Sequence, residues 1–316
     1  MAHETNATEP VEDLVIIGGG VAGFTAAMYA GRAAIAPLVI LGNALGGQTA
    51  MTESIDNYPG FPDGVGGVEL TELVQQQALK YGARLEYDMV ESVDFGRRPL
   101  VIKTSSRTIL ARTVIIATGA QPRRLNVPGE AGFIGRGVSF CATCDGYFYK
   151  DKVVAVIGGG NSALDESLYL ARLAAKVYVV HRRDEFRADK IIQEHIHQNP
   201  RVECIMNTVV EEILGEEHVR AVRLRDVKAG KVWDLPVDGV FEYVGLTPNS
   251  SLFAGQLELD EAGYIVTDKR QHTSVDGVFA AGDVQSPYFR QVVIAAGTGA
   301  TAAIEAARYL EANRPA

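Results

Sequence analysis

Short apolar runs that end in glycine recur along the chain, and they predict buried parallel strands that lead into helices. One run covers residues 13–17 and another covers 152–157, each just before a glycine cluster. Alanine-rich segments with helical character follow at 22–32 and near 163–174, and each leads to another apolar run. A continuous apolar run of this length is typical of a strand that is covered on both faces. The pattern therefore predicts two copies of one α/β fold rather than a short-period repeat.

Two further apolar runs end at a glycine and help to divide the chain. Residues 113–120 end in Ala-Thr-Gly-Ala, and residues 277–284 precede a helical, alanine-rich stretch over 291–312. Polar, proline-containing stretches at 120–125 and 245–250 are typical of hinges between domains. We therefore predict the following domains: an inserted domain of residues 123–249, and a split domain of residues 1–122 and 250–316.

The composition is that of a globular protein with an acidic balance. Of 316 residues, 47% are hydrophobic, and the formal net charge is −9. An acidic chain gains no electrostatic help from nucleic acid or anionic lipid, so we expect neither partner. No apolar stretch approaches the roughly 18 residues that indicate a membrane-spanning helix. Residues 1–10 lack the basic start and apolar run of a signal peptide, so we expect a short frayed tail there.

The first glycine cluster, Gly18-x-Gly20-x-x-Gly23, predicts a dinucleotide site. Such glycines let the chain turn tightly and bring backbone N–H groups to a pyrophosphate at a helix N-terminus. The acidic residue that often holds a ribose hydroxyl about 20 residues later is missing, because Leu41 and Gly42 stand at the end of the next strand. The ribose contact must therefore come from another part of the chain.

The second cluster, Gly158-x-Gly160-x-x-Ala163, is the variant with alanine in the third position. The strand that follows ends in His-Arg-Arg at 181–183, and Arg187 comes four residues later. Arginines at this point suit a 2′-phosphate, because a guanidinium offers several donors to phosphate oxygens. The alternative is a solvated basic turn.

The cysteines indicate redox chemistry in a reducing compartment, and we expect the cytoplasm. Cys141, Cys144 and Cys204 are too few for a disulfide framework. The two-residue spacing of Cys141 and Cys144 permits a disulfide and readily lowers a thiol pKa. A zinc site would need another Cys or His pair at suitable spacing, and the sequence has none, so we expect no metal. We interpret Cys204 as an inert core residue.

Two carboxylates have more than one interpretation. Asp145 follows Cys144 and precedes Gly146, so it is a turn residue, a proton donor and acceptor for the thiols, or both. Asp283 follows a strand end, where ligands gather in open α/β sheets, but it could instead cap the next helix. In that helix two glycines fall within residues 291–300, and each weakens a helix by about 1 kcal/mol. They predict a close approach to a ligand or to another helix.

These motifs occur together in one known family. The chain resembles the low-molecular-weight thioredoxin reductases over nearly its full length. The resemblance rests on the two glycine clusters and on the following segments: 46–48 (Gly-Gly-Gln), 57–60 (Asn-Tyr-Pro-Gly), 117–119 (Ala-Thr-Gly), 135–146 (which contains the cysteine pair), 181–188, 282–284 (Gly-Asp-Val) and 290–299.

The resemblance implies two Rossmann-like domains of the three-layer ββα type, with FAD in the split domain and NADPH in the inserted one. It also implies a homodimer and a thioredoxin as the protein substrate. The FAD residues would be Gly18, Gly20, Gly23, Gly46, Gly47, Gln48, Asn57, Ala117, Thr118, Gly119, Gly282, Asp283, Arg290, Gln291 and Val292. The NADPH residues would be Gly158, Gly160, Asn161, Ser162, Ala163, His181, Arg182, Arg183 and Arg187.

The resemblance also implies roles around the cysteine pair. Cys144 would be the thiol nearest the flavin, Cys141 would attack the partner disulfide, and Asp145 would be their acid and base. Arg136, Tyr147 and Phe148 would form the surface that docks thioredoxin. Because the cysteine pair and the NADPH site share one domain, both cannot face the flavin at once. We therefore hypothesise that the inserted domain rotates about its two hinges.

Other functions on the same fold have to be weighed against this one. A dithiol oxidase that uses oxygen, or a reductase fed by ferredoxin, would not need the three arginines at 182, 183 and 187. A ferredoxin–NADP reductase without a redox disulfide would lack Cys141 and Cys144. A non-catalytic flavoprotein that senses redox state would differ from an enzyme in a simple turnover assay.

Overall fold

The computed structural model describes residues 10–52, 55, 57–285 and 289–314. Residues 1–9 of the expected N-terminal tail lie outside these ranges. Among the described residues, no helix combines the length and the apolar character that crossing a bilayer requires.

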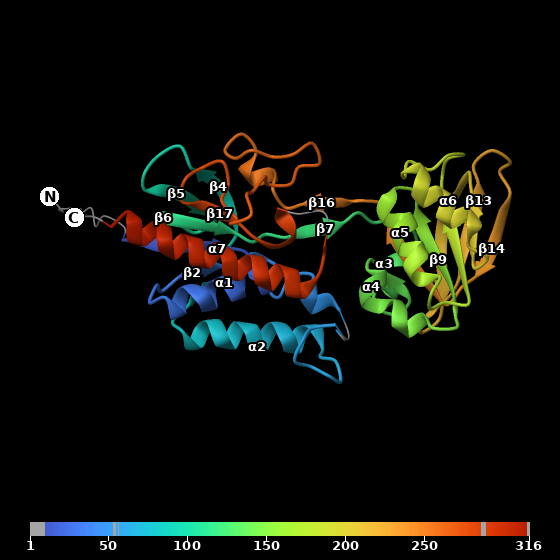
Figure 1. Ribbon diagram of the computed structural model, residues 1–316, viewed down its shortest axis with the longest axis horizontal. Coiled ribbons are helices and arrows are strands. Elements are labelled where there is room, and N and C mark those ends of the chain that lie inside the picture. Colours follow the sequence, from blue (N-terminus) through green and yellow to red (C-terminus); the bar gives the residue numbers. More distant parts are fainter. Residues whose placement is uncertain (1–9, 53–54, 56, 286–288, 315–316) are drawn as a thin grey trace. The chain divides into compact units, whose positions relative to one another are not determined.

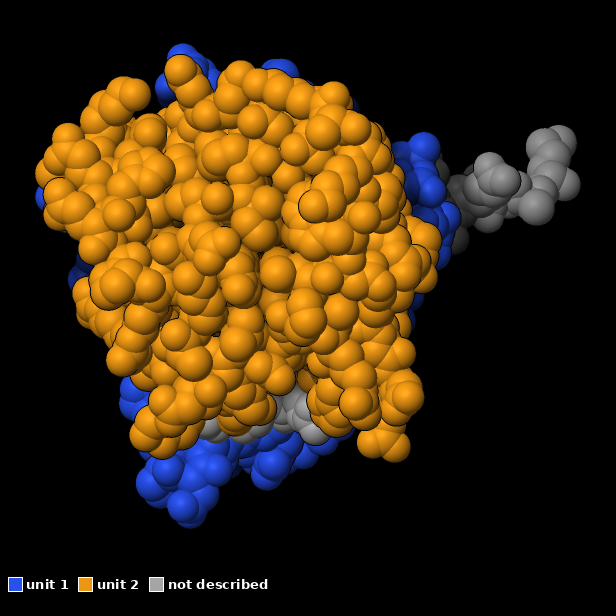
Figure 2. Space-filling view, turned by 90° about the vertical axis from the view of Figure 1, so that its right-hand side faces the viewer, with its two compact units in different colours: residues 1–121, 247–316 blue, residues 122–246 orange. Residues whose placement is uncertain are grey.

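The chain divides into two compact units, coloured separately in Figure 2. The split unit consists of Met1–Gln121 and Thr247–Ala316, and the inserted unit is Pro122–Leu246. The sequence placed the boundaries after residues 122 and 249. At the boundaries, the short strands β7 (Ala120–Pro122) and β16 (Leu246–Pro248) pair with each other as a two-stranded sheet.

The split unit is built on a seven-stranded sheet with the order β3-β2-β1-β6-β5-β4, in which β17 also pairs with β6. Strands β1, β2, β3, β6 and β17 are parallel, whereas β4 and β5 form an antiparallel extension. The strand bounds are β1 (Val11–Ile17), β2 (Leu38–Ile40), β3 (Arg84–Glu86), β4 (Val90–Asp94), β5 (Leu100–Thr104), β6 (Thr108–Ile116) and β17 (Val278–Ala280).

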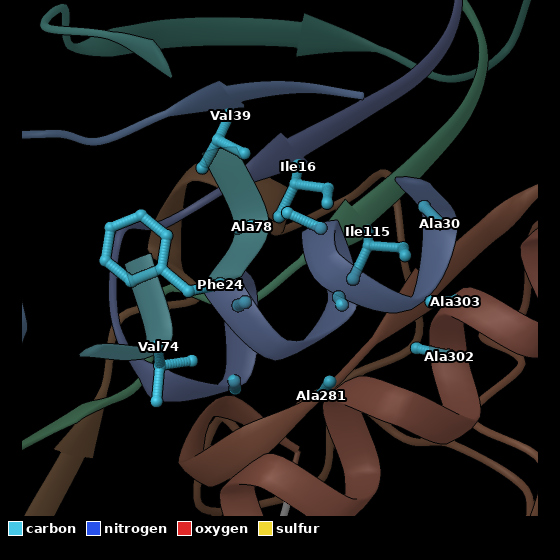
Figure 3. Packing of buried hydrophobic residues seen from close by; sticks show 14 of the residues in the cluster. Ile16, Phe24, Ala30, Val39, Val74, Ala78, Ile115, Ala281, Ala302 and Ala303 are labelled. Carbon is cyan, nitrogen blue, oxygen red and sulfur yellow. The ribbon is translucent and has the colours of Figure 1, made fainter. Parts of the chain in front are cut away.

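Alternate side chains of β1 enter two different cores. Leu14 and Ile16 face the helices α1 (Val21–Arg32), α2 (Gly67–Lys80) and α7 (Val292–Ala312), while Val15 and Ile17 face a second apolar cluster. In Figure 1, α1 lies between α7 and α2 on the helical side of the sheet. Figure 3 shows Phe24 and Ala30 of α1 among side chains of the strands, α2 and α7. Both faces of β1 are therefore buried, as its unbroken apolar sequence predicts.

The inserted unit has a parallel five-stranded sheet with the order β11-β10-β9-β15-β8. One face packs against α5 and α6, and the other face packs against the antiparallel sheet β12-β13-β14. The bounds are β8 (Val138–Ser139), β9 (Val153–Gly158), β10 (Lys176–Val180), β11 (Val202–Ile205), β12 (Thr208–Gly215), β13 (Val219–Asp226), β14 (Val232–Pro236), β15 (Gly239–Tyr243), α5 (Asn161–Leu170) and α6 (Lys190–Gln198). This three-layer arrangement confirms the predicted class of fold.

The ends of α5 differ from the sequence prediction. The helix begins at Asn161, directly after the glycine turn, and ends at Leu170 rather than near residue 174. Residues 171–174 form turns that still satisfy its last carbonyls, because Ala174 N–H donates to Leu170 O at 2.8 Å. The remaining short helices are α3 (Glu130–Phe133), α4 (Ala142–Asp145), η1 (Thr49–Met51), η2 (Gly146–Tyr149), η3 (Ser251–Phe253) and η4 (Gly282–Val284).

The glycines of α7 differ in what surrounds them. A Cβ on Gly299 would lie 2.2 Å from the Ala22 carbonyl oxygen of α1, so the two helices meet backbone to backbone at this point. The predicted close approach to another helix is confirmed for Gly299. Beside Gly297, a Cβ would meet no described atom within 4 Å.

Candidate nucleotide sites and the redox disulfide

The first glycine turn, between β1 and α1, has the shape of a pyrophosphate cradle. Gly18 has a φ of +122°, and a Cβ there would lie 2.3 Å from the Ala117 carbonyl oxygen. A Cβ on Gly23 would lie 2.0 Å from Gly18 O, so the third glycine lets the helix pack closely on the turn. Gly20, by contrast, has open space beside it, which leaves its backbone accessible to a phosphate.

Two other predicted segments lie beside this turn. Gly46 has a φ of +81°, and its N–H donates to Gly19 O at 2.9 Å, so residues 46–48 adjoin the glycine turn. The segment 117–119 follows β6, and Ala117 N–H donates to Ile17 O at 2.8 Å. The side chain of Asn249, which sequence reasoning missed, donates to Thr118 O at 2.8 Å and fixes this second segment.

The chain also joins residues that are far apart in the sequence. Asn57 Nδ2 donates to Gln291 Oε1 at 3.1 Å, although 234 positions separate the two residues. Gln291 is the N-cap of α7, so Asp283 does not cap that helix and lies instead in η4, at the end of β17. Burial raises the pKa of Asp283 to about 6, and the positive charge of Arg290 partly opposes the shift.

The predicted binding residues of the split unit lie in two groups. Val292 begins α7 directly after Gln291, and Gly282 N–H donates to Thr298 Oγ1 of the same helix at 2.9 Å. The predicted residues of the split unit thus form two groups: one around the glycine turn and one at the start of α7. The close-packed glycines and the open edge at Gly20 fit a dinucleotide.

The second glycine turn, between β9 and α5, repeats the first with one difference. A Cβ on Gly158 would lie 2.7 Å from both the Ala163 Cβ and the Tyr243 carbonyl oxygen, whereas Gly160 has open space. A Cβ on Gly159 would lie 2.3 Å from the His181 ring, so this ring lies directly beneath the turn. The turn therefore again offers an open edge at its middle glycine. Ser162, in the first turn of α5, is exposed.

The arginines that follow β10 are available to a phosphate. Arg182, Arg183 and Arg187 are all exposed. Asp184, which could have neutralised them, instead pairs with Lys228 at 3.0 Å. The loop thus presents three guanidinium groups beside a glycine turn, which is the donor set that a 2′-phosphate needs.

His181 has a different environment from the arginines, although the sequence grouped it with them. Its ring is only 6% exposed, and Nε2 lies 3.1 Å from Glu185 O. Burial lowers the pKa of His181, and the nearby arginine charges lower it further. The ring is therefore neutral near pH 7 and supports the turn from below.

Cys141 and Cys144 form a disulfide, so the predicted pair exists as a bond. The bond closes the short helix α4, of which Cys141 is the N-cap, and both residues are partly exposed. Among the described residues, no group of three or more His, Cys, Asp or Glu side chains could hold a metal ion. A bond between the two sulfurs is what two-electron thiol–disulfide chemistry requires.

Two residues that sequence reasoning missed hold the disulfide motif in place. Ser139 is 5% exposed; its hydroxyl donates to Asp145 Oδ2 at 2.6 Å and accepts from Cys141 N–H at 3.1 Å. The hydroxyl oxygen of Tyr243 accepts a bond from Ala142 N–H at 2.6 Å. Ser139 lies in the same short segment as the cysteines, although no role was predicted for it, whereas Tyr243 comes from β15, about 100 positions away, and no short motif could have revealed it. Asp145 is thus anchored at one oxygen, next to the cysteines.

The residues predicted to dock a partner are exposed. Tyr147 and Phe148 follow α4 in η2 and are 66% and 45% exposed. Arg136 is also exposed, and its guanidinium donates to Gly132 O at 2.5 Å. Cys204 differs from the redox pair: it is half-buried in β11, packs against the core of the inserted unit, and burial raises the pKa of its thiol.

Comparisons with known proteins assign the chain to a class. The model of the pyridine nucleotide-disulphide oxidoreductase family matches residues 12–299. The thioredoxin reductase of Mycolicibacterium smegmatis is 45% identical over 304 residues, covering 96% of this chain and 98% of that protein. The thioredoxin reductase of Treponema pallidum is 46% identical over 301 residues, covering 95% and 97%. The crystal structure of thioredoxin reductase from Streptococcus pyogenes superposes with a TM-score of 0.91 at 42% identity, covering 96% and 99%.

The chain therefore belongs to the pyridine nucleotide-disulphide oxidoreductases, and it is an enzyme. Within that class it belongs to the thioredoxin reductase family, as the sequence motifs predicted. It is a flavoprotein disulfide reductase that uses FAD and NADPH, which confirms the predicted cofactors.

Proposed function

We propose that the protein passes electrons from NADPH, through FAD, to the Cys141–Cys144 disulfide, and from the resulting dithiol to the disulfide of a thioredoxin. The observation that carries the proposal is a disulfide in the same unit as a glycine turn flanked by three exposed arginines. We assign FAD to the split domain, residues 1–122 and 250–316, and NADPH to the inserted domain, residues 123–249.

In the split domain, the glycine turn at Gly18–Gly23 holds the FAD pyrophosphate through backbone N–H groups. Residues 46–48 and 117–119, which adjoin this turn, border the same ligand. Asn57 and Gln291, bonded to each other, form the second group with Asp283 and Arg290. Asp283 stands at a strand end, where a carboxylate can accept bonds from ribityl or ribose hydroxyls.

In the inserted domain, the backbone N–H groups of residues 158–163 would hold the pyrophosphate of NADPH, and Arg182, Arg183 and Arg187 would hold its 2′-phosphate. The guanidinium groups prefer the doubly charged phosphate over the hydroxyl of NADH. His181 supports the turn and carries no charge to the ligand. When both cofactors are bound, they supply the hydride and the two-electron carrier that this chemistry needs.

At the disulfide, reduction adds two electrons and two protons to Cys141 and Cys144. Asp145, held by Ser139, passes protons to and from the sulfurs. The thiolate of Cys141 then attacks the partner disulfide, and one partner sulfur leaves as a thiolate. Cys144 next attacks the Cys141 sulfur, which re-forms the internal disulfide and releases the second partner thiol.

The partner surface consists of Arg136, Tyr147 and Phe148. Exposed aromatic and arginine side chains are the residue types that most often anchor protein interfaces. Their exposure, and the position of Tyr147 and Phe148 directly after the cysteine helix, support this proposal. We further propose that the protein works in the cytoplasm as a homodimer.

The first test is anaerobic mixing of the FAD-loaded protein with NADPH, with the flavin absorbance as the readout. We expect rapid bleaching with NADPH and much slower bleaching with NADH. Absence of bleaching despite bound FAD would refute entry of electrons from a nicotinamide. It would favour a ferredoxin-fed reductase or an oxidase instead.

The second test separates the disulfide step from flavin reduction. Cys141→Ser and Cys144→Ser should each abolish NADPH-dependent reduction of thioredoxin and leave bleaching of the flavin by NADPH intact. Cys204→Ser is the matched control and should retain both activities. Thioredoxin reduction by either of the first two variants would contradict the proposed electron path.

A further inference from the structure

In the inserted unit, hydrogen bonds between Asn161 and Asp189 join the glycine turn to residues 181–189, which we call the arginine loop. Asn161 is the first residue of α5, and Asp189 is the N-cap of α6. Asn161 Nδ2 donates to Asp189 Oδ2 at 2.9 Å, and Asp189 N–H donates to Asn161 Oδ1 at 2.8 Å. Both polar atoms of the asparagine side chain are therefore engaged with one residue of the loop.

Other contacts between the arginine loop and the glycine turn add to these two hydrogen bonds. Arg187 N–H donates to Gly159 O at 2.8 Å, so the backbone of the loop touches the backbone of the turn. The His181 ring fills the space beneath Gly159. From the loop side, Gln193 Nε2 donates to Ala188 O at 2.7 Å. Both bonds between Asn161 and Asp189 depend on the Asn161 side chain, so a single substitution there removes them without changing the backbone contacts.

We propose that Asn161 and Asp189 are positioning residues for selectivity toward the 2′-phosphate: their paired bonds set where the arginine loop stands relative to the glycine turn. This inference rests on the proposed use of NADPH. A bound dinucleotide would span the two elements, with its pyrophosphate at the turn and its 2′-phosphate at the arginines. Correct spacing between them therefore decides whether both phosphates are held at once.

The proposed selectivity depends on the position of the arginine loop rather than on the charge of Asp189. Asp189 carries the wrong charge to attract a phosphate, so its role cannot be direct recognition. The arginine loop ends only two residues after Arg187, so the bonds at Asp189 restrain the backbone that carries this arginine. Such restraint matters because ordering an exposed side chain costs conformational entropy on binding. A loop that is already ordered by these bonds loses less conformational entropy when the ligand binds.

The experiment compares two probes that differ only in the 2′-phosphate, adenosine 2′,5′-bisphosphate and adenosine 5′-monophosphate. Their Kd values are measured by calorimetry with the FAD-loaded protein. Asn161→Ala should weaken binding of the bisphosphate about tenfold, which corresponds to the net value of one or two hydrogen bonds. Binding of the monophosphate should change less than about twofold, because the glycine turn itself is intact.

Two further variants define the role. Asp189→Asn keeps both bonds in the same geometry and should bind the bisphosphate at least as tightly as the wild type does. Glu194→Ala, at an exposed position of α6, is the matched control and should bind both probes as the wild type does. In steady state, Asn161→Ala should raise the KM for NADPH by a larger factor than it changes kcat.

The failures of the two proposals can be told apart. A wild-type protein that binds both probes equally would refute the arginine site and thereby the proposed use of NADPH. A wild-type protein that prefers the bisphosphate, with an Asn161→Ala variant that keeps the same preference, would overturn only the positioning role. Equal weakening of both probes by Asn161→Ala would also overturn it, because that result indicates damage to the turn.

Discussion

Replacing Glu242 by glutamine should stabilise the inserted unit at neutral pH and remove much of the loss of stability between pH 4.5 and about 8. Glu242 lies in β15, is 2% exposed, and faces Glu130, which is also 2% exposed. Within the described part of the chain, no donor reaches either oxygen of Glu242 with full hydrogen-bond geometry, although the Glu130 side chain and the Leu125 backbone lie close enough to act on its pKa. Burial is the main cause that raises the pKa of Glu242 from 4.5 to about 8, and the charge of Glu130 adds to it.

The sign and size of the effect follow from linkage. Between pH 4.5 and about 8, the folded protein holds a proton on Glu242 that the unfolded chain has lost. Stability therefore decreases as pH rises through this window, by about 1.4 kcal/mol per pH unit. At pH 7 the accumulated cost is about 3 kcal/mol. Glutamine has no proton to lose, and its amide can donate to Glu130.

The assay is urea unfolding of the FAD-loaded protein at pH 5 and pH 8. It yields the transition midpoint and the slope of the unfolding free energy against urea concentration. Glu242→Gln should match the wild type within about 1 kcal/mol at pH 5 and exceed it by several kcal/mol at pH 8. Glu217→Gln, at an exposed position of the same unit, should show no such pH-dependent difference. A gain for Glu242→Gln of the same size at both pH values would refute the buried-carboxyl argument.

Two other predictions concern packing and the disulfide motif. Gly297→Ala should stabilise α7 by up to about 1 kcal/mol, whereas Gly299→Ala should destabilise the protein by about 1–3 kcal/mol, because only the second Cβ collides with α1. Thermal unfolding of both variants measures the difference, and equal shifts of the melting temperature would contradict it. Ser139→Ala removes the donor that holds Asp145, so it should slow thioredoxin reduction about tenfold without slowing flavin reduction by NADPH. Ser139→Thr keeps the hydroxyl and should restore the rate, and a variant that impairs both steps equally would indicate a merely structural role.

Local sequence determined the repeated strand–turn–helix units, because their signals lie within a few neighbouring residues. The apolar run of β1 and the glycines at 18, 20 and 23 each have a backbone reason that needs no distant partner. The same holds for the disulfide of Cys141 and Cys144, whose spacing closes a single helical turn. The third glycine of the first turn was predictable too, since a helix that leaves a strand this closely leaves no room for a Cβ.

Only the tertiary structure decided which distant residues serve the same site. Asn57 meets Gln291 across 234 positions, and Tyr243 meets Ala142 across 101, because the folded chain brings separate segments to the same place. It also decided between interpretations that sequence left open, for Asp283 does not cap α7 and Gly299 packs on α1 rather than on a ligand. The buried pair of Glu130 and Glu242 has no sequence signal at all, since burial and the resulting pKa depend on the whole surrounding fold. The sequence therefore determines features that depend on neighbouring residues, such as the glycine turns and the cysteine pair. The tertiary structure determines the distances between remote residues and the burial that shifts their pKa values.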